Sequence, residues 1–225
     1  MSICNKVLNY YNNLEKNTVP ENIEVLDPYC KDEVKKIQRD FYGRYFKDSK
    51  RRIIIFGINP GRFGGGITGI PFTDPYNLSF KCNISSNFKS TKELSSSFIY
   101  EMIDEYGGVK NFYNDYIISS ICPYGFTKNG KNLNYYDDNH LIKNWKNNII
   151  KSISDQLTSF GSKQVCIIIG KGKNQIFFEL LNKEYKFFNE IIALPHPRWI
   201  LQYRSKQKKI FIKQYVETLK KIKHE

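Results

Sequence analysis

Residues 51–74 (RRIIIFGINPGRFGGGITGIPFTD) constrain the possible fold more than any other stretch of the chain. They open with an uninterrupted and mostly β-branched run, Ile53 to Phe56, which is typical of a central parallel strand buried on both faces. A glycine-rich loop follows directly from Gly57. Because ligands bind beyond the carboxyl ends of the strands in open α/β sheets, this loop is the first candidate for a functional site.

Three further apolar runs are predicted to form strands, with amphipathic segments between them. The predicted strands are 53–56, 116–121, 165–169 and 190–194, and the predicted helices are 3–14, 34–45, 94–106, 141–157, 174–181 and 205–222. Strands that alternate with helices are typical of a parallel sheet covered by helices. The sequence therefore predicts an α/β fold, a three-layer α/β/α sandwich with a central four-stranded parallel sheet. The polar segments 76–91 and 127–139 are predicted to be irregular loops.

The length and composition indicate one domain. A chain of 225 residues with 40% hydrophobic content is long enough for one well-packed domain and short for two. We expect a single domain over residues 1–225 that works as a monomer. No apolar run has the length of a signal-peptide core or of a bilayer span, so a cytoplasmic protein without membrane contact is expected.

The chain is strongly basic, with 35 Lys and Arg residues against 22 Asp and Glu and a net charge of +13. Such an excess is commonly used to gather phosphates, so nucleic acid is the first candidate partner, with a plain solvated basic surface as the alternative. The five cysteines are odd in number and widely scattered, without a CxxC pair. They predict reduced thiols, with neither a disulfide framework nor a metal cluster.

The glycines of the loop admit two interpretations. A phosphate-binding loop needs GxxxxGK followed by Ser or Thr, or GxGxxG opening a helix, whereas here no lysine follows the glycines and the loop runs into Pro71. Alternatively, the glycines let a flat ligand lie close to the backbone, where a Cβ would clash. Asn59 could then hold a water molecule and Phe72 offer a ring face, with hydroxyls from Thr68 and Thr73. In the absence of a ligand, Asn59 would cap a turn and Phe72 would belong to the core.

One histidine is expected at the same edge of the sheet. His196 lies between prolines after the predicted strand 190–194, in the sequence Leu-Pro-His-Pro-Arg. A lone histidine is often structural, but flanking prolines hold this one rigidly at a strand end, which favours a functional role as well. His140, at a helix start, and His224, in the lysine-rich tail, are set aside.

Three motifs at the predicted strand ends resemble a known family. Residues 57–64 (GINPGRFG), followed by 68–72 (TGIPF), resemble the first motif of the uracil-DNA glycosylase superfamily and are most similar to its single-strand-selective monofunctional family. Cys122-Pro123 after the second strand and His196-Pro197 after the fourth fall where that family has its base-recognition and second catalytic motifs. The resemblance covers most of residues 50–205.

The resemblance implies a monofunctional DNA glycosylase that flips and excises deaminated bases in base excision repair, without a metal, a nucleotide cofactor or a lysine nucleophile. Asn59 would hold the attacking water, Phe72 would stack on the base and His196 would hydrogen-bond the departing base. Cysteine spacing excludes the iron-sulfur branches of the superfamily. The expected substrate-binding residues are Gly57, Ile58, Gly61, Phe63, Gly64, Phe72 and Ser120.

The chain departs from the family pattern at one residue that concerns the choice of base. Two residues before Cys122-Pro123, where the family has an asparagine that reads the edge of uracil, this chain has Ser120, a smaller group with one hydroxyl. A roomier pocket that admits other deaminated bases, such as xanthine or hypoxanthine, is the hypothesis that this residue motivates.

A second departure follows His196-Pro197, where the family continues Ser-Pro-Arg-Asn and this chain has residues 198–204 (RWILQYR). Trp199, Ile200 or Tyr203 could wedge into the gap left by a flipped base, with arginines on phosphates; a hydrophobic lead-in to the last helix is the alternative. The expected DNA-binding residues are Arg62, Arg198, Trp199, Gln202, Tyr203 and Arg204.

Two other classes of function fit the same sequence. One is a non-catalytic nucleic-acid-binding module that keeps the glycosylase fold, which predicts salt-dependent binding without formation of abasic sites. The other is a nucleotide- or phosphate-binding α/β protein, which predicts saturable affinity for free nucleotides.

Overall fold

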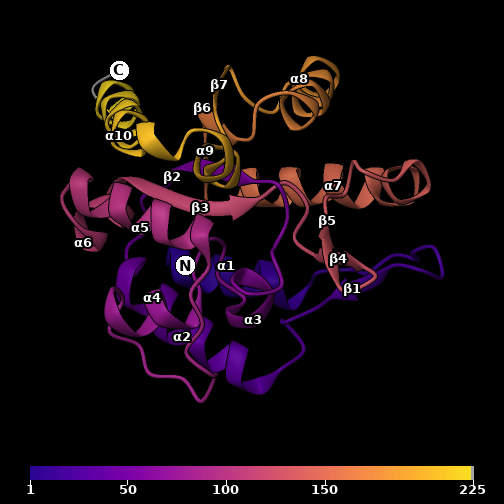
Figure 1. The fold of residues 1–225 in the computed structure, drawn as a ribbon, viewed down its shortest axis with the longest axis horizontal. Coiled ribbons are helices and arrows are strands. Elements are labelled where there is room, and N and C mark those ends of the chain that lie inside the picture. Colours follow the sequence, from indigo (N-terminus) through magenta and orange to yellow (C-terminus); the bar gives the residue numbers. More distant parts are fainter. Residues whose placement is uncertain (224–225) are drawn as a thin grey trace.

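The computed structural model describes residues 1–223 and is built around a four-stranded sheet (Figure 1). The strands are β2 (Arg52–Gly57), β3 (Tyr116–Ser120), β6 (Gly161–Ile169) and β7 (Glu190–Leu194), in the order β3-β2-β6-β7. Each neighbouring pair is parallel. All four predicted strands are confirmed, and β6 begins at Gly161 rather than at Val165.

Helices cover both faces of the sheet, as the three-layer prediction requires. Figure 1 shows α8 and α10 on opposite sides of β6 and β7. On one side α5 packs against α9 and α10, whereas α1 packs against α2 and α7. The helices are α1 (Ile3–Asn12), α2 (Asp32–Tyr45), α3 (Gly65–Thr68), α4 (Pro75–Phe80), α5 (Leu94–Tyr106), α6 (Val109–Asp115), α7 (Asn139–Ser159), α8 (Lys173–Tyr185), α9 (Pro197–Tyr203), the 3-10 turn η1 (Ser205–Gln207) and α10 (Lys208–Lys223).

The two segments predicted to be irregular loops contain regular structure, so that prediction is wrong for part of each. Within 76–91, α4 begins at Pro75, and the Asp74 carboxylate caps it by accepting the Asn77 N–H at 2.7 Å. Within 127–139, β4 (Gly125–Lys128) and β5 (Lys131–Leu133) form a hairpin, and β1 (Glu24–Leu26) pairs with β4. Asn129 and Gly130 take the positive φ angles that a two-residue hairpin turn requires.

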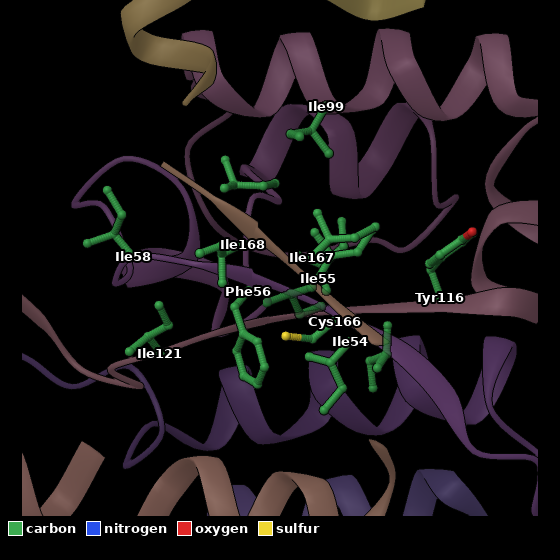
Figure 2. Close-up of a cluster of buried hydrophobic side chains, with 14 of the residues drawn as sticks. Ile54, Ile55, Phe56, Ile58, Ile99, Tyr116, Ile121, Cys166, Ile167 and Ile168 are labelled. Atoms are coloured by element: carbon green, nitrogen blue, oxygen red, sulfur yellow. The ribbon is translucent and has the colours of Figure 1, made fainter. Parts of the chain in front are cut away.

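The core packs against both faces of β2, which leaves the end of this strand as the open position. Ile54 and Phe56 are fully buried, and Figure 2 shows them on the same side of β2 as Cys166. Ile55 faces the opposite side, toward Ile99 of α5. Because neither face of the strand is free, a ligand can approach β2 only at an end, and in open α/β sheets ligands bind at the carboxyl end.

Candidate active site

A cavity of about 710 Å³ lies at the carboxyl edge of the sheet. All four parallel strands contribute residues to it at or just beyond their ends. The predicted site residues that line it are Gly57, Ile58, Asn59, Gly61, Phe72, Ser120, His196, Arg198, Trp199, Gln202 and Tyr203. Segments that are far apart in the sequence therefore meet where the parallel topology predicted a site.

The Asn59 side chain is held in a fixed orientation by the segment at the end of β5. Its Nδ2 donates to the Leu133 carbonyl oxygen at 3.2 Å, and its Oδ1 accepts the Tyr135 N–H, also at 3.2 Å. These two bonds settle which end of the amide is nitrogen and which is oxygen. Since an amide nitrogen carries two hydrogens and an amide oxygen two lone pairs, one donor and one acceptor site remain for a ligand or a water molecule.

The Phe72 ring forms a wall of the cavity, and Gly57 makes room for it. A Cβ built on Gly57 would lie 2.6 Å from Phe72 Cε2, so a side chain at this position would collide with the ring. Phe72 itself has φ 53°, in the left-handed region that few aromatic residues adopt. Its ring centroid lies 5.8 Å from that of His196. The ring therefore fills the space between the end of β2 and His196.

His196 caps α9, and this bond determines where its proton lies. The Nδ1 atom accepts the Arg198 N–H at 3.1 Å, so the neutral ring carries its proton on Nε2. Burial, with a further contribution from the positive charge of Arg198, lowers the pKa of His196 to about 4. His196 is thus a neutral hydrogen-bond donor at physiological pH.

Ser120 stands beside Gly57 at the floor of the cavity, because the two residues pair between β3 and β2. The Ser120 carbonyl oxygen accepts a hydrogen bond from Gln156 Nε2 at 3.2 Å. No group among residues 1–223 hydrogen-bonds its hydroxyl, and the residue lines the cavity. A hydroxyl both donates and accepts, so it does not select one pattern of polar groups on a ligand.

Aromatic and basic residues of α9 form the rim of the cavity. Trp199 and Tyr203 are exposed, and their ring centroids lie 6.4 Å apart. The guanidinium of Arg204 lies over the Trp199 ring, 5.7 Å from its centroid. Ile200 is fully buried, so the prediction that it could act as the wedge is wrong. Trp199 and Tyr203 remain available for that role.

Several predicted residues lie outside the cavity lining. Arg62 and Phe63 project from the loop surface, with the Arg62 guanidinium over the Phe63 ring at 4.3 Å, and Arg62 donates to the Gly130 carbonyl. Gly64 is buried beneath the loop. The hydroxyls of Thr68 and Thr73 are buried and tied to neighbours, Thr68 to the Thr73 carbonyl at 2.6 Å and Thr73 to Tyr100 at 2.9 Å, so the role of ligand-binding hydroxyls expected for them is wrong.

The cavity also contains polar residues that the sequence did not point to. They are Glu93, Ser95, Asn132, Asn134, Tyr136, Lys171 and Gln214. None belongs to a motif, and the hairpin that brings Asn132 and Asn134 into the lining lies in a segment expected to be irregular. Its Asn-Gly turn was the one local signal for it. His140 lies outside the lining, and His224 falls outside the described residues.

Neither a metal site nor a membrane span occurs in residues 1–223. No group of three or more His, Cys, Asp and Glu side chains in this part of the chain could hold a metal ion, and no helix combines the length and apolar character needed to cross a bilayer. All five cysteines are free thiols.

The fold and the residues at the strand ends define a class of protein that sequence comparison also recognises. The model of the "Uracil DNA glycosylase superfamily" matches residues 44–220. The chain belongs to this superfamily, whose members act on DNA.

Among solved structures, the crystal structure of wild-type Pedobacter heparinus SMUG2 is similar to the whole molecule. The two chains are 41% identical, the match covers 100% of each, and the TM-score is 0.96. No curated protein matches the sequence. The predicted resemblance to the uracil-DNA glycosylases, and to their single-strand-selective branch, is confirmed.

Proposed function

We propose that this protein is a monofunctional DNA glycosylase that flips a deaminated base out of DNA and hydrolyses its N-glycosidic bond with a bound water molecule. One observation supports this above all others. Asn59, Phe72 and His196 come from distant parts of the chain and line one cavity at the carboxyl edge of the sheet. A water-holding amide, a stacking ring and a neutral donor are the groups that this reaction needs.

His196 would stabilise the leaving base. As the bond breaks, positive charge builds on the sugar and negative charge on the base. The Nε2–H of neutral His196 would donate to an oxygen of the base, with the ring already held by the bond from the Arg198 N–H. A donor that is oriented before the reaction contributes about 10²–10³-fold in rate.

Asn59 would hold the attacking water close to the sugar C1′. Its amide is fixed by Leu133 and Tyr135, so the water would be positioned without any loss of side-chain freedom during the reaction. Because water attacks the sugar directly, no covalent intermediate with a lysine is required.

Phe72 and Ser120 would decide which bases are accepted. The ring would stack on the flipped base, which contributes about 1–3 kcal/mol without regard to sequence. The Ser120 hydroxyl would read the polar edge, and as a small donor and acceptor it fits uracil as well as xanthine or hypoxanthine. We therefore include deaminated purines among the proposed substrates.

The rim of α9 would hold the DNA. Trp199 or Tyr203 would fill the gap that the flipped base leaves, and Arg62, Arg198, Gln202 and Arg204 would contact the backbone. The net charge of +13 supports a salt-dependent, sequence-independent contribution to affinity. We propose that the chain works on DNA inside the cell, as a single-domain monomer.

The test is release of bases from oligonucleotides that carry one uracil, xanthine or hypoxanthine, single- or double-stranded, followed by alkaline cleavage at the abasic site. We expect cleavage products from uracil substrates and from at least one deaminated purine. Binding that depends on salt, without any cleavage product, would support the non-catalytic module instead.

A further inference from the structure

Glu93 stands at the N-terminus of α5 but does not cap the helix with its side chain. Its backbone N–H donates to Asp74 Oδ2 at 2.6 Å, and no side-chain cap bond is present. Instead the carboxyl group turns into the cavity and forms part of its lining. A glutamate in this position could bond a free backbone N–H of its own helix, whereas Glu93 presents its carboxyl group to the cavity.

The carboxyl group lies directly on the loop that carries Asn59. A Cβ built on Gly61 would lie 2.8 Å from Glu93 Oε1, and a Cβ on Gly64 would collide with Oε2. A side chain at either glycine of the first motif would therefore push this carboxyl group out of the place it occupies. The sequence had suggested that Gly61 and Gly64 make room for a base; in the structure they make room for Glu93.

The Asn59 amide and the Glu93 carboxyl group both lie close to β5. Asn59 Nδ2 donates to the Leu133 carbonyl. The space beside Gly61 that Glu93 Oε1 occupies is bordered by Asn132 Nδ2, 3.5 Å from the same Cβ position. Asn59, Glu93 and Asn132 all line this cavity.

The half-buried carboxyl group of Glu93 has no partner among residues 1–223. In this part of the chain its carboxyl oxygens make no hydrogen bond and no ion pair, and the half-buried side chain lines the cavity, so these oxygens are available to a ligand or a water molecule there. The charged groups that act on it are Asp74, at the start of α4, and Arg198, on α9. Burial first and the Asp74 carboxylate second raise the pKa of Glu93 to about 7, against the opposing effect of Arg198.

We propose that Glu93 is a further catalytic residue of this site, the general base that accepts a proton from the water held by Asn59. This inference rests on the proposed glycosylase function. The water oxygen bonds to C1′ while the C1′–N bond breaks, and the electron pair of that bond leaves with the base, which His196 stabilises as an anion. One proton of the water passes to a Glu93 oxygen. It is later released to the base or to solvent, which restores the carboxylate.

The surroundings of Glu93 suit this role. A general base works best when its pKa lies near the operating pH, because it must be ionised and still attract a proton. The same carboxylate would also stabilise the positive charge that builds on the sugar. In the described part of the chain its oxygens hold no hydrogen bond and line the cavity, so they can accept one from a water molecule bound there.

The experiment is a pH series of single-turnover base release from uracil-containing DNA by the full chain and its Glu93→Gln variant. In the wild type we expect the rate to rise with pH and to level off above about pH 7. In Glu93→Gln we expect the plateau rate to fall by about 10²-fold or more and the inflection near pH 7 to disappear, with DNA binding retained. Glu93→Asp should keep the inflection at a reduced rate. The matched control is Glu105→Gln, the same chemical change at an exposed position of α5, which should match the wild type.

Two results would overturn the inference: a Glu93→Gln variant with the wild-type rate and pH profile, or a wild-type rate that does not change between about pH 5.5 and 8.5. The second result needs no variant, so it applies even if Glu93→Gln fails to fold. Failure of the proposed function is distinguishable, because the wild type would then release no base at any pH.

Discussion

Replacement of Gly57 by alanine is expected to displace the Phe72 ring and so to damage the base cavity without unfolding the protein. The new Cβ would lie 2.6 Å from Cε2 and 3.2 Å from Cζ of Phe72. Non-bonded carbons prefer a separation of about 3.5–4.0 Å, so the ring must move by about 1 Å. Gly57 does not have a positive φ, so the backbone itself accepts alanine.

The magnitude follows from the contact that is lost. Stacking of one base on an aromatic ring contributes about 1–3 kcal/mol. Complete loss of that stacking would lower kcat/KM by about 5- to 150-fold, since about 1.4 kcal/mol corresponds to a factor of ten. The assay is steady-state release of uracil from single-stranded DNA, with the melting temperature measured alongside to verify folding.

Two further variants distinguish this explanation from general damage. Gly43→Ala, in α2, adds a Cβ with no heavy atom within 4 Å and should leave kcat/KM unchanged while stabilising the helix by about 0.5–1 kcal/mol. The double variant Gly57→Ala/Phe72→Ala should be no slower than Phe72→Ala alone, because both changes act through one ring. Wild-type kcat/KM in Gly57→Ala, or additive losses in the double variant, would refute the reasoning.

Three other predictions concern the polar residues. His196→Gln should lower the single-turnover rate by about 10²–10³-fold. The pKa of His196 is lowered to about 4, so the ring should be a neutral donor throughout the assay range. An inflection near pH 6.5 in the pH–rate profile of the wild type that disappears in His196→Gln would contradict this neutral state. Ser120→Asn should increase the ratio of kcat/KM for uracil to that for xanthine, and an unchanged ratio would show that Ser120 does not set base choice. The pKa of Glu93 is raised to about 7 in the folded state, so between pH 4.5 and about 7 the folded protein binds more protons at Glu93 than the unfolded chain does, and the free energy of unfolding falls as pH rises. Glu93→Gln should therefore have a higher melting temperature than the wild type at about pH 8. A lower melting temperature would contradict the raised pKa.

The fold could be predicted because its strongest signals are local. The run from Ile53 to Phe56 is continuous and apolar, and this pattern is typical of a strand with both faces buried. Once four such strands are joined by helices, their carboxyl ends must lie at one edge, which brings Asn59 and His196 together from opposite halves of the chain. The motifs could then be recognised as parts of one site because they lie at those strand ends.

The parts that could not be predicted depend on tertiary contacts. Glu93 follows a polar segment with no recognisable pattern, and its place in the cavity results from the approach of α5 to Gly61 and Gly64. Asn59 likewise owes its orientation to Leu133 and Tyr135 at the end of β5, a strand in a segment predicted to be irregular. Ile200 looked suited to DNA contact, but α9 turns it into the core.

The measurement that tests the central claim most directly compares base release and DNA binding in Asn59→Ala. The account assigns Asn59 to positioning of the attacking water, so single-turnover release of uracil should fall by at least about 10²-fold while the affinity for the same DNA is retained. An Asn59→Ala variant that releases uracil at the wild-type rate would contradict the proposed mechanism.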